Sequence, residues 1–434
     1  MNRRQLLGYG SSAVVGAAGI GHTVKGAQGE EAGKNNTAAE GGGEPLPDPR
    51  NPRDPRSPGA PLFPGDAWYF SPWAAWTYQH ISEMRPTAPI SRGPGPVQPL
   101  PQSLQPIGDI KVKFEDGEGT VNDFLGESFT DGFLVLHRGQ IVFERYMNNL
   151  APHRQHLWMS STKALIAMLT GIVVNKGLVE VTKPVTHYLP ELEATAYKGA
   201  TVQHLLDMSS GVVYDDDYDP LWRDSVFSQP DGPRTMWELA LTMDKAERPH
   251  GAAYKYKSSD VDVLGFILQR VSGMYLADLI SQEIWAPMGA EQDAYMVVDK
   301  TGFGLADGGL CTTLRDFGRF AQLIVDGGAR EGRQIIPQSW IDETLGGRGA
   351  PGSNYHNQWE IDPDGRGMGK GGQGGQYVYV EPAAEFAAVK FSHFTLPYRE
   401  EDRTAGPYQE VERKVNPRTG GLRPALDAIR AALS

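Results

Sequence analysis

The stretch "KALIAMLTGIVVNKGLVE", which begins at Lys163, is apolar almost all round. A surface helix carries its apolar residues in one stripe, whereas a helix without a polar face has to be covered on every side. Gly177 stands where this helix is expected to end, because glycine readily adopts the left-handed conformation found just past helix ends. The sequence therefore predicts a buried helix that the rest of the fold has to enclose.

Strands are predicted on both sides of this helix along the chain. "DGFLVLHRGQIVFERYM" predicts two strands joined by a tight turn at Arg138 and Gly139, and "GGQYVYVEP" and "EFAAVKFS" predict a second pair near the C-terminus. The intervening residues are mostly helical with long loops, and "RPALDAIRAAL" closes the chain as a helix. We expect one discontinuous α/β domain, with its α/β part at about 67–174 and 301–434 and an inserted, mostly helical lobe at about 175–300.

The totals exclude some classes of function. The chain has 434 residues and a formal net charge of −12, which makes a nucleic-acid backbone an unsuitable partner because that interaction needs a basic face. A single cysteine, Cys311, excludes an intramolecular disulfide and a cysteine-rich zinc site. We expect Cys311 to be a small buried residue.

The first residues predict export. Arg3 and Arg4 precede "QLL" and a short, glycine-rich apolar run, an order similar to a twin-arginine signal at residues 1–28. No cysteine follows it, so a lipid anchor is excluded, and the run is too short for a membrane span. Residues 29–66 are dense in Pro, Gly and charge and predict a disordered linker. The aromatic segment "DAWYFSPWAAWTYQH" should then pack against a catalytic domain at 67–434, exported to the periplasm or beyond.

The start of the buried helix reads "LWMSSTKA" and contains the first chemical signal. Only Ser160 has a lysine three positions later, and residues at i and i+3 share a helix face, so Lys163 can reach its hydroxyl. Burial favours the neutral, basic form of a lysine, and such a base makes a serine nucleophilic. The N–H of Ser160 can also bind an oxyanion at the helix start. The pattern Ser-x-x-Lys also arises by chance in a chain of this length, so it needs support from elsewhere.

Two further motifs supply that support. In "YKYKSSDVDVLGFILQRVSG", Tyr256 should project from the entry to a second helix, where a phenol beside an ammonium can relay a proton; the alternative is that Tyr254 and Tyr256 alternate on a strand edge. In "GMGKGGQGGQYVYVEP", glycines approach a strand and allow close contact with a ligand. There the N–H of Gln373 can complete an oxyanion hole, and Lys370 can attract a substrate carboxylate.

With the three motifs in this order, the chain resembles the serine β-lactamase and penicillin-recognising superfamily, most closely its class C-like branch. "PTAPISRG", "TVQHLLDMSSG", "YKSSDVDVLG" and "GGQYVYV…AVKFS" resemble the 6-aminohexanoate-dimer hydrolases, which cleave nylon oligomers. The resemblance covers residues 68–432. It implies a β-lactamase/transpeptidase-like α/β fold, in which helices flank an antiparallel sheet.

The resemblance also implies roles for individual residues. Ser160 would be the acylated nucleophile, Lys163 its base and Tyr256 a proton carrier, while the N–H groups of Ser160 and Gln373 would hold the oxyanion. Ser258 stands where lactamases usually have asparagine, and Lys370-Gly371-Gly372 replaces Lys-Thr-Gly, so these positions belong to the expected substrate-binding surface. Both departures weaken the case for efficient β-lactam hydrolysis, whereas the nylon-oligomer branch tolerates the serine.

Other residues carry weaker signals. Asp215, Asp216 and Asp217, flanked by Tyr214 and Tyr218, can line the cleft and attract a substrate amine, or can form a solvated loop; of these, Tyr214 and Asp217 are the candidates for substrate contact. His153 and His156 have metal-like spacing, but no motif supplies a third ligand, so packing or hydrogen bonding is expected.

The expected protein is thus a serine hydrolase that cleaves an amide or ester of a small molecule through an acyl-enzyme. It needs no metal or organic cofactor, has no nucleic-acid partner and no stable membrane anchor, and is a monomer or a homodimer. Two alternatives share the site: a carboxylesterase, and a D-peptidase or penicillin-binding enzyme. A third is a non-catalytic sensor that stays acylated.

Overall fold

The structure is a computed structural model, and it describes residues 68, 73–114, 117–214, 233–394 and 421–434. The predicted signal at 1–28 and the linker at 29–66 lie outside the described residues. The same holds for Asp215, Asp216, Asp217 and Tyr218 of the acidic loop.

The large sheet is antiparallel and has seven strands within the described part of the chain. In spatial order they are β11 (Tyr355–His356), β12 (Trp359–Ile361), β13 (Met368–Gly372), β14 (Gln376–Glu381), β15 (Phe386–Ser392), β4 (Thr130–His137) and β5 (Gln140–Tyr146). Strands from both ends of the catalytic domain therefore lie side by side, because β15 pairs with β4. This pairing confirms the predicted α/β class with an antiparallel sheet.

Both strand pairs predicted from the sequence are hairpins of the large sheet. Arg138 and Gly139 have φ values of 53° and 73°, as a two-residue turn between twisted strands requires, and they confirm the predicted β4–β5 hairpin. The predicted pair near the C-terminus is also confirmed as β14 and β15. The glycine-rich run was expected to lead into a strand, but it forms β13 itself and pairs with β14. Glycines at 369, 371 and 372 are thus strand residues, and the turn follows them.

A small sheet holds the segment before the central helix. Its order is β1 (Thr87–Ile90), β7 (Ala294–Val297), β8 (Leu310–Thr312) and β6 (His156–Leu157). The aromatic segment packs behind it, as predicted: Trp68 and Tyr78 are buried in a cluster with Leu157 and Met159. The carbonyl of Tyr78 accepts a hydrogen bond from the N–H of Leu157 at 2.9 Å. Two minor hairpins pair β2 (Lys111–Phe114) with β3 (Gly117–Thr120) and β9 (Ala329–Arg330) with β10 (Arg333–Gln334).

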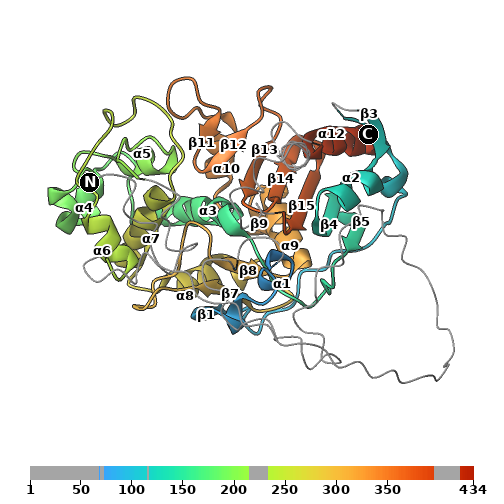
Figure 1. Ribbon diagram of the computed structural model, residues 1–434, viewed down its shortest axis with the longest axis horizontal. Coiled ribbons are helices and arrows are strands. Elements are labelled where there is room, and N and C mark those ends of the chain that lie inside the picture. The colour runs from blue at the N-terminus through green and yellow to red at the C-terminus, as the bar shows by residue number, and fades with distance from the viewer. Residues whose placement is uncertain (1–67, 69–72, 115–116, 215–232, 395–420) are drawn as a thin grey trace, which may run out of the picture. The chain divides into compact units, whose positions relative to one another are not determined.

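The central helix is α3 (Thr162–Asn175), and it lies between the large sheet and the helices of the middle of the chain (Figure 1). It contacts β13 on one side and α7 (Ser258–Ser272) on the other. Gly177 follows its end with φ 72°, which confirms the predicted stop. The other α-helices among the described residues are α1 (Ala74–Thr77), α2 (Val121–Glu127), α4 (Val185–Tyr188), α5 (Val202–Leu206), α6 (Met236–Leu241), α8 (Leu276–Ile280), α9 (Leu314–Val325), α10 (Gln338–Gly346) and α12 (Leu422–Leu433).

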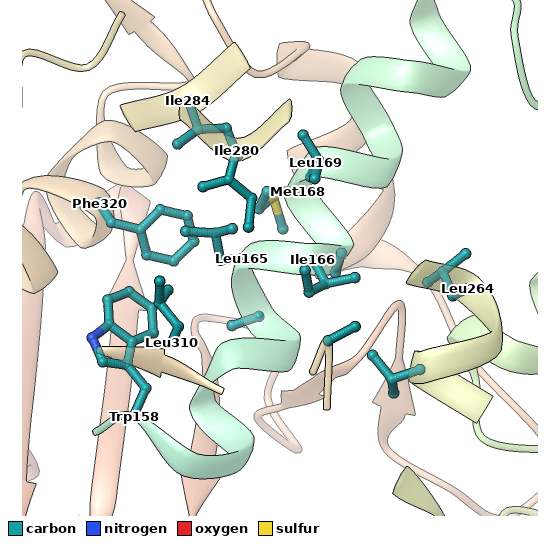
Figure 2. Close-up of a cluster of buried hydrophobic side chains, with 14 of the residues drawn as sticks. Trp158, Leu165, Ile166, Met168, Leu169, Leu264, Ile280, Ile284, Leu310 and Phe320 are labelled. Atoms are coloured by element: carbon teal, nitrogen blue, oxygen red, sulfur yellow. The ribbon is translucent and has the colours of Figure 1, made fainter. Parts of the chain in front are cut away.

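Every residue of α3 from Thr162 to Val173 is buried. Figure 2 shows why: Leu165 and Met168 point toward Ile280 and Phe320, whereas Ile166 points toward Leu264 of α7. Full burial of one such side chain stabilises the fold by about 1.5–3 kcal/mol. The predicted buried helix is confirmed, and its first turn is thereby held rigidly.

No single helix among the described residues is both long and apolar enough to cross a bilayer. Only the bent pair of Ser258–Ser272 and Leu276–Trp285 meets that test jointly, by length and composition alone.

Candidate active site

Ser160 lies in the 3₁₀ turn Met159–Ser161, which connects β6 of the small sheet to α3. The preceding Trp158 is fixed from two sides, because its N–H donates to the carbonyl of Leu310 at 2.8 Å and its indole donates to Thr312 at 2.6 Å. Met159 is buried and has φ 50°, a left-handed conformation that costs a non-glycine residue about 1–3 kcal/mol. Strain of this kind persists only where the surrounding packing enforces it. Here the left-handed Met159 makes the chain change direction between β6 and Ser160. Ser160 itself is half-buried.

Lys163 is wholly buried and reaches Ser160 as the spacing predicts. Its Nζ donates to the Oγ of Ser160 at 3.1 Å, to the Oγ of Ser258 at 3.4 Å and to the carbonyl oxygen of Asp307 at 2.5 Å. Three acceptors match the three N–H groups of an ammonium. The carboxylate of Asp307 lies 4.0 Å from the same nitrogen. The site is therefore complementary to a charged Lys163.

Tyr256 approaches Ser160 from the entry to α7. Its hydroxyl donates to the Oγ of Ser160 at 2.6 Å. Lys257 is the N-cap of the helix, and Tyr256 lies outside any strand, so the strand-edge alternative is wrong. The ring centroid is 5.2 Å from the Nζ of Lys163 and 5.0 Å from the Nζ of Lys370, distances at which cations attract an aromatic face. The serine hydroxyl is thus in hydrogen-bond contact with both candidate proton carriers.

Lys370 lies on β13, beside this trio, but it is buried. Its Nζ donates to the hydroxyl of Tyr355 at 2.7 Å and lies 4.4 Å from the centroid of that ring. The carbonyl of Lys370 accepts a hydrogen bond from the Oγ of Ser161 at 3.0 Å. Ser161 therefore joins the start of α3 to β13, and the charge of Lys370 acts next to Tyr256.

Gly372 brings the end of β13 against the Met159–Ser161 turn, which carries Ser160. A Cβ atom at this position would lie 2.5 Å from the carbonyl oxygen of Trp158 and 3.0 Å from the nitrogen of Ser161, so only glycine fits. Gln373 follows at the turn into β14, with its side chain exposed. Gly372, the residue before Gln373, therefore lies against the turn that carries Ser160, so the two segments predicted to supply the oxyanion donors are neighbours.

The remaining predicted residues separate into two groups. Ser258 lies inside the site as the first residue of α7, within hydrogen-bond distance of Lys163. Tyr214 is half-buried and packs against the main core at the end of a described segment. Asp217 lies outside the described residues, so the contribution of the acidic loop stays a prediction.

The predictions that His156 forms hydrogen bonds and that Cys311 is buried are confirmed. His156 is buried and its Nε2 lies 3.0 Å from the carboxylate of Asp131, which His393 also contacts at 2.7 Å. Burial opposes ionisation of Asp131, but His393 and His156 hold its pKa at about 2. The described residues, His153 included, form no group of three metal-ligating side chains. Cys311 is fully buried, and burial raises the pKa of its thiol.

Two buried side chains of opposite charge, Lys257 and Asp260, support the start of α7 through their common partner Ser210. Lys257 and Asp260 are both without exposed surface, and Asp260 accepts hydrogen bonds from Ser210 at 2.7 Å and from Tyr197 at 3.2 Å. Burial raises the pKa of Asp260 to about 6, although Lys257 and these hydrogen bonds lower it. Burial likewise lowers the pKa of Lys257 against the attraction of Asp260. This pair fixes the segment that carries Tyr256 and Ser258.

Sequence reasoning missed Asp307, Asp262 and Tyr355. Asp307 occurs in "LADGGLCTT", which belongs to none of the three motifs. Asp262 is on α7, and its Oδ1 accepts the N–H of Asp307 at 3.3 Å. Their contacts join residues far apart along the chain, so no spacing rule could have found them. The available signal was weak: Asp262 lies in the same motif as Tyr256, and a buried lysine such as Lys163 needs an acid nearby.

A serine that opens a buried helix beside an antiparallel sheet, within reach of a lysine and a tyrosine, is the arrangement expected of a serine hydrolase of the β-lactamase/transpeptidase-like fold. A family model described as Beta-lactamase matches residues 128–410, and the chain belongs to this family. The resemblance noted in the sequence is thereby confirmed.

Two relatives narrow the comparison. The 6-aminohexanoate-dimer hydrolase of Paenarthrobacter ureafaciens is 31% identical over 360 residues, which are 76% of this chain and 88% of that protein. The structure of a candidate 6-aminohexanoate-dimer hydrolase from Bacillus anthracis has a TM-score of 0.73 at 26% identity and covers 84% of this chain and 96% of its own. A penicillin-binding protein homologue from Caulobacter crescentus has a TM-score of 0.53 at 15% identity, covering 72% of this chain and 96% of its own, and shares the fold alone.

Proposed function

We propose that this serine hydrolase cleaves the amide bond of a short linear substrate, of the type represented by a 6-aminohexanoate dimer, through an acyl-enzyme on Ser160. The observation that carries the mechanism is the position of the Ser160 Oγ, 3.1 Å from the Nζ of Lys163 and 2.6 Å from the hydroxyl of Tyr256. The choice of substrate is supported by the relative that is 31% identical over 88% of its length.

In the acylation step, the Oγ of Ser160 attacks the carbonyl carbon while neutral Lys163 takes the hydroxyl proton, directly or through Tyr256. The carbonyl oxygen becomes an oxyanion, and the N–H groups of Ser160 and Gln373 donate to it. Lys163 is then an ammonium whose three N–H groups have acceptors in Ser160, Ser258 and Asp307. Because catalysis depends on tighter interactions in the transition state than in the ground state, this match lowers the barrier.

Collapse of the tetrahedral intermediate breaks the carbon–nitrogen bond. The departing nitrogen takes a proton from Tyr256, which recovers one from Lys163, so the amine leaves neutral and the serine stays acylated. A water molecule then repeats the sequence: the Lys163–Tyr256 pair accepts its proton, the hydroxide oxygen adds to the ester carbon, and the Oγ of Ser160 leaves with that proton. The acid product and the starting enzyme result.

The substitution Ser160→Ala tests this proposal on three substrates: a linear 6-aminohexanoate dimer, a short-chain aryl ester and a chromogenic cephalosporin. We expect wild-type turnover of the linear amide and the ester, little turnover of the cephalosporin, and a loss of about 10⁴-fold or more in Ser160→Ala. Ser161→Ala is the matched control, since it removes the adjacent hydroxyl and should cost less than about tenfold.

The outcome of the panel also separates the alternatives. Turnover of the ester without the amide would make the protein a carboxylesterase. A stable adduct on Ser160 without turnover would make it a sensor. Full activity of Ser160→Ala would refute the mechanism.

A further inference from the structure

Asp307 contacts the buried lysine through both its main chain and its side chain. Its carbonyl oxygen accepts a hydrogen bond from the Nζ of Lys163, and its carboxylate lies 4.0 Å from the same nitrogen. Both side chains are buried, with exposed fractions of 0% for Lys163 and 1% for Asp307. Water therefore screens their interaction very little.

The turn that carries Asp307 is fixed by its neighbours. The carbonyl of Leu305 accepts the N–H of Gly309 at 2.9 Å, and the carbonyl of Gly309 accepts the N–H of Val297 at 2.9 Å. The N–H of Asp307 donates to Asp262 on α7. Asp307 is thus held between α7 and the small sheet, and its distance from Lys163 does not depend on a flexible side chain alone.

Other titratable groups surround this pair. The ring of Tyr256 faces Lys163, and Asp262 of α7 contacts Asp307. Lys370, which is on β13, lies near the same tyrosine ring. The neighbouring Lys257 and Asp260 carry opposite charges and attract each other. Within this group, the carboxylate of Asp307 forms an ion pair with Lys163 at 4.0 Å.

We propose that Asp307 is a positioning residue of the acyl-transfer site: its carboxylate stabilises the ammonium that Lys163 becomes when it takes the proton of Ser160. The inference rests on the proposed function, in which Lys163 is the base. The role is comparable to that of the acid in a Ser-His-Asp triad, which orients and stabilises the protonated base without accepting the proton. No bond to Asp307 forms or breaks.

The sign of the effect on pH dependence follows from the charges. A carboxylate beside an ammonium favours the charged form, so removal of the carboxylate favours the neutral amine. In Asp307→Asn, the carbonyl that accepts from Lys163 remains and the side chain keeps its size, but the charge is lost. The acid limb of the kcat/KM profile, where Lys163 becomes protonated, should therefore move to lower pH, and the plateau should fall because the ammonium is less stabilised.

The experiment is the pH profile of ester hydrolysis for wild type, Asp307→Asn and Asp307→Glu, with Asp316→Asn as the matched control. Asp316 is equally buried but pairs with Arg319 on α9. For Asp307→Asn we expect kcat to fall about 10- to 100-fold with KM changed less than threefold, and the acid limb to move by about one pH unit or more. Asp307→Glu should restore part of kcat and part of the wild-type position of the acid limb. Asp316→Asn should leave the acid limb at its wild-type pH.

Two results would overturn the inference. One is an Asp307→Asn profile that matches wild type in both height and position. The other is a loss of activity that follows only the loss of folded protein, seen by thermal melting and active-site titration, with an unmoved limb. If wild type shows no turnover that depends on Ser160, the proposed function is wrong. That result differs from the two above, in which wild type is active and only the role of Asp307 is wrong.

Discussion

Gly372 is the position at which the smallest substitution should disturb the site most. Its Cα faces the Met159–Ser161 turn, and an added Cβ would lie 2.5 Å from the carbonyl oxygen of Trp158 and 3.0 Å from the Cβ of Met159. The carbonyl of Trp158 cannot turn aside, because it accepts the N–H of Ser161. The change Gly372→Ala therefore has to push β13 and the turn apart.

The size of this displacement sets the expected effect. Ordinary contact begins at 3.4 Å, so the separation has to grow by 3.4 − 2.5 = 0.9 Å. A shift of that size moves the N–H of Gln373, the next residue, away from the position of the oxyanion. Loss of one such donor costs about 10²–10³ in kcat, or about 2.7–4 kcal/mol. Overpacking should also lower the free energy of unfolding by about 1–3 kcal/mol.

The assay is steady-state hydrolysis of an aryl ester, with active-site titration to count folded enzyme and thermal melting to measure stability. The control is Gly126→Ala on α2, where an added Cβ meets nothing within 4 Å. That change should leave kcat unaltered and hold or raise the melting temperature, since alanine favours a helix over glycine. A Gly372→Ala enzyme with at least half the wild-type kcat would refute the close approach of Gln373 to the oxyanion.

Two further predictions concern proton carriers and pH. Tyr256→Phe removes the hydroxyl 2.6 Å from Ser160 and should lower kcat for the linear amide about 10²–10⁴-fold, with a smaller loss for an aryl ester whose leaving group needs no proton; equal losses on both substrates would exclude leaving-group protonation. Burial lowers the pKa of His356, but hydrogen bonds to Asp207 and Glu343 raise it to about 9, above its unfolded value. This stabilisation is complete below about pH 6.5 and is lost as pH rises through about 9, so urea unfolding should show wild type losing on the order of 1–2 kcal/mol more than His356→Asn over that range, and parallel curves would contradict the pairing.

The sequence predicted those parts of the site that local geometry determines. Helix periodicity selected Ser160 over Ser161, because only Ser160 has Lys163 one turn away, and the structure joins them at 3.1 Å. The apolar run that begins there predicted a buried helix, which explains why Lys163 has no exposed surface. Tyr256 was found because a helix entry fixes the direction of the residue before it.

Contacts between distant segments could not be predicted in this way. Asp307 approaches Lys163 only because α7 and the small sheet hold its turn in place, and no local pattern encodes that packing. The glycine run was expected to lead into a strand, but it forms β13 itself, because pairing with β14 outweighs the low strand preference of glycine. Burial of Lys370 beneath Tyr355 likewise depends on the pairing of β11 through β13.

The most direct test of the account is to identify the acylated residue. Wild-type enzyme is mixed with an aryl ester, quenched within the first turnover, digested and mapped by mass spectrometry, while the released phenol is followed in parallel. We predict a burst of one phenol per active site and one acyl group on the peptide that contains Ser160, with neither in Ser160→Ala. An acyl group on any other residue, or steady turnover by Ser160→Ala at the wild-type rate, would contradict the account.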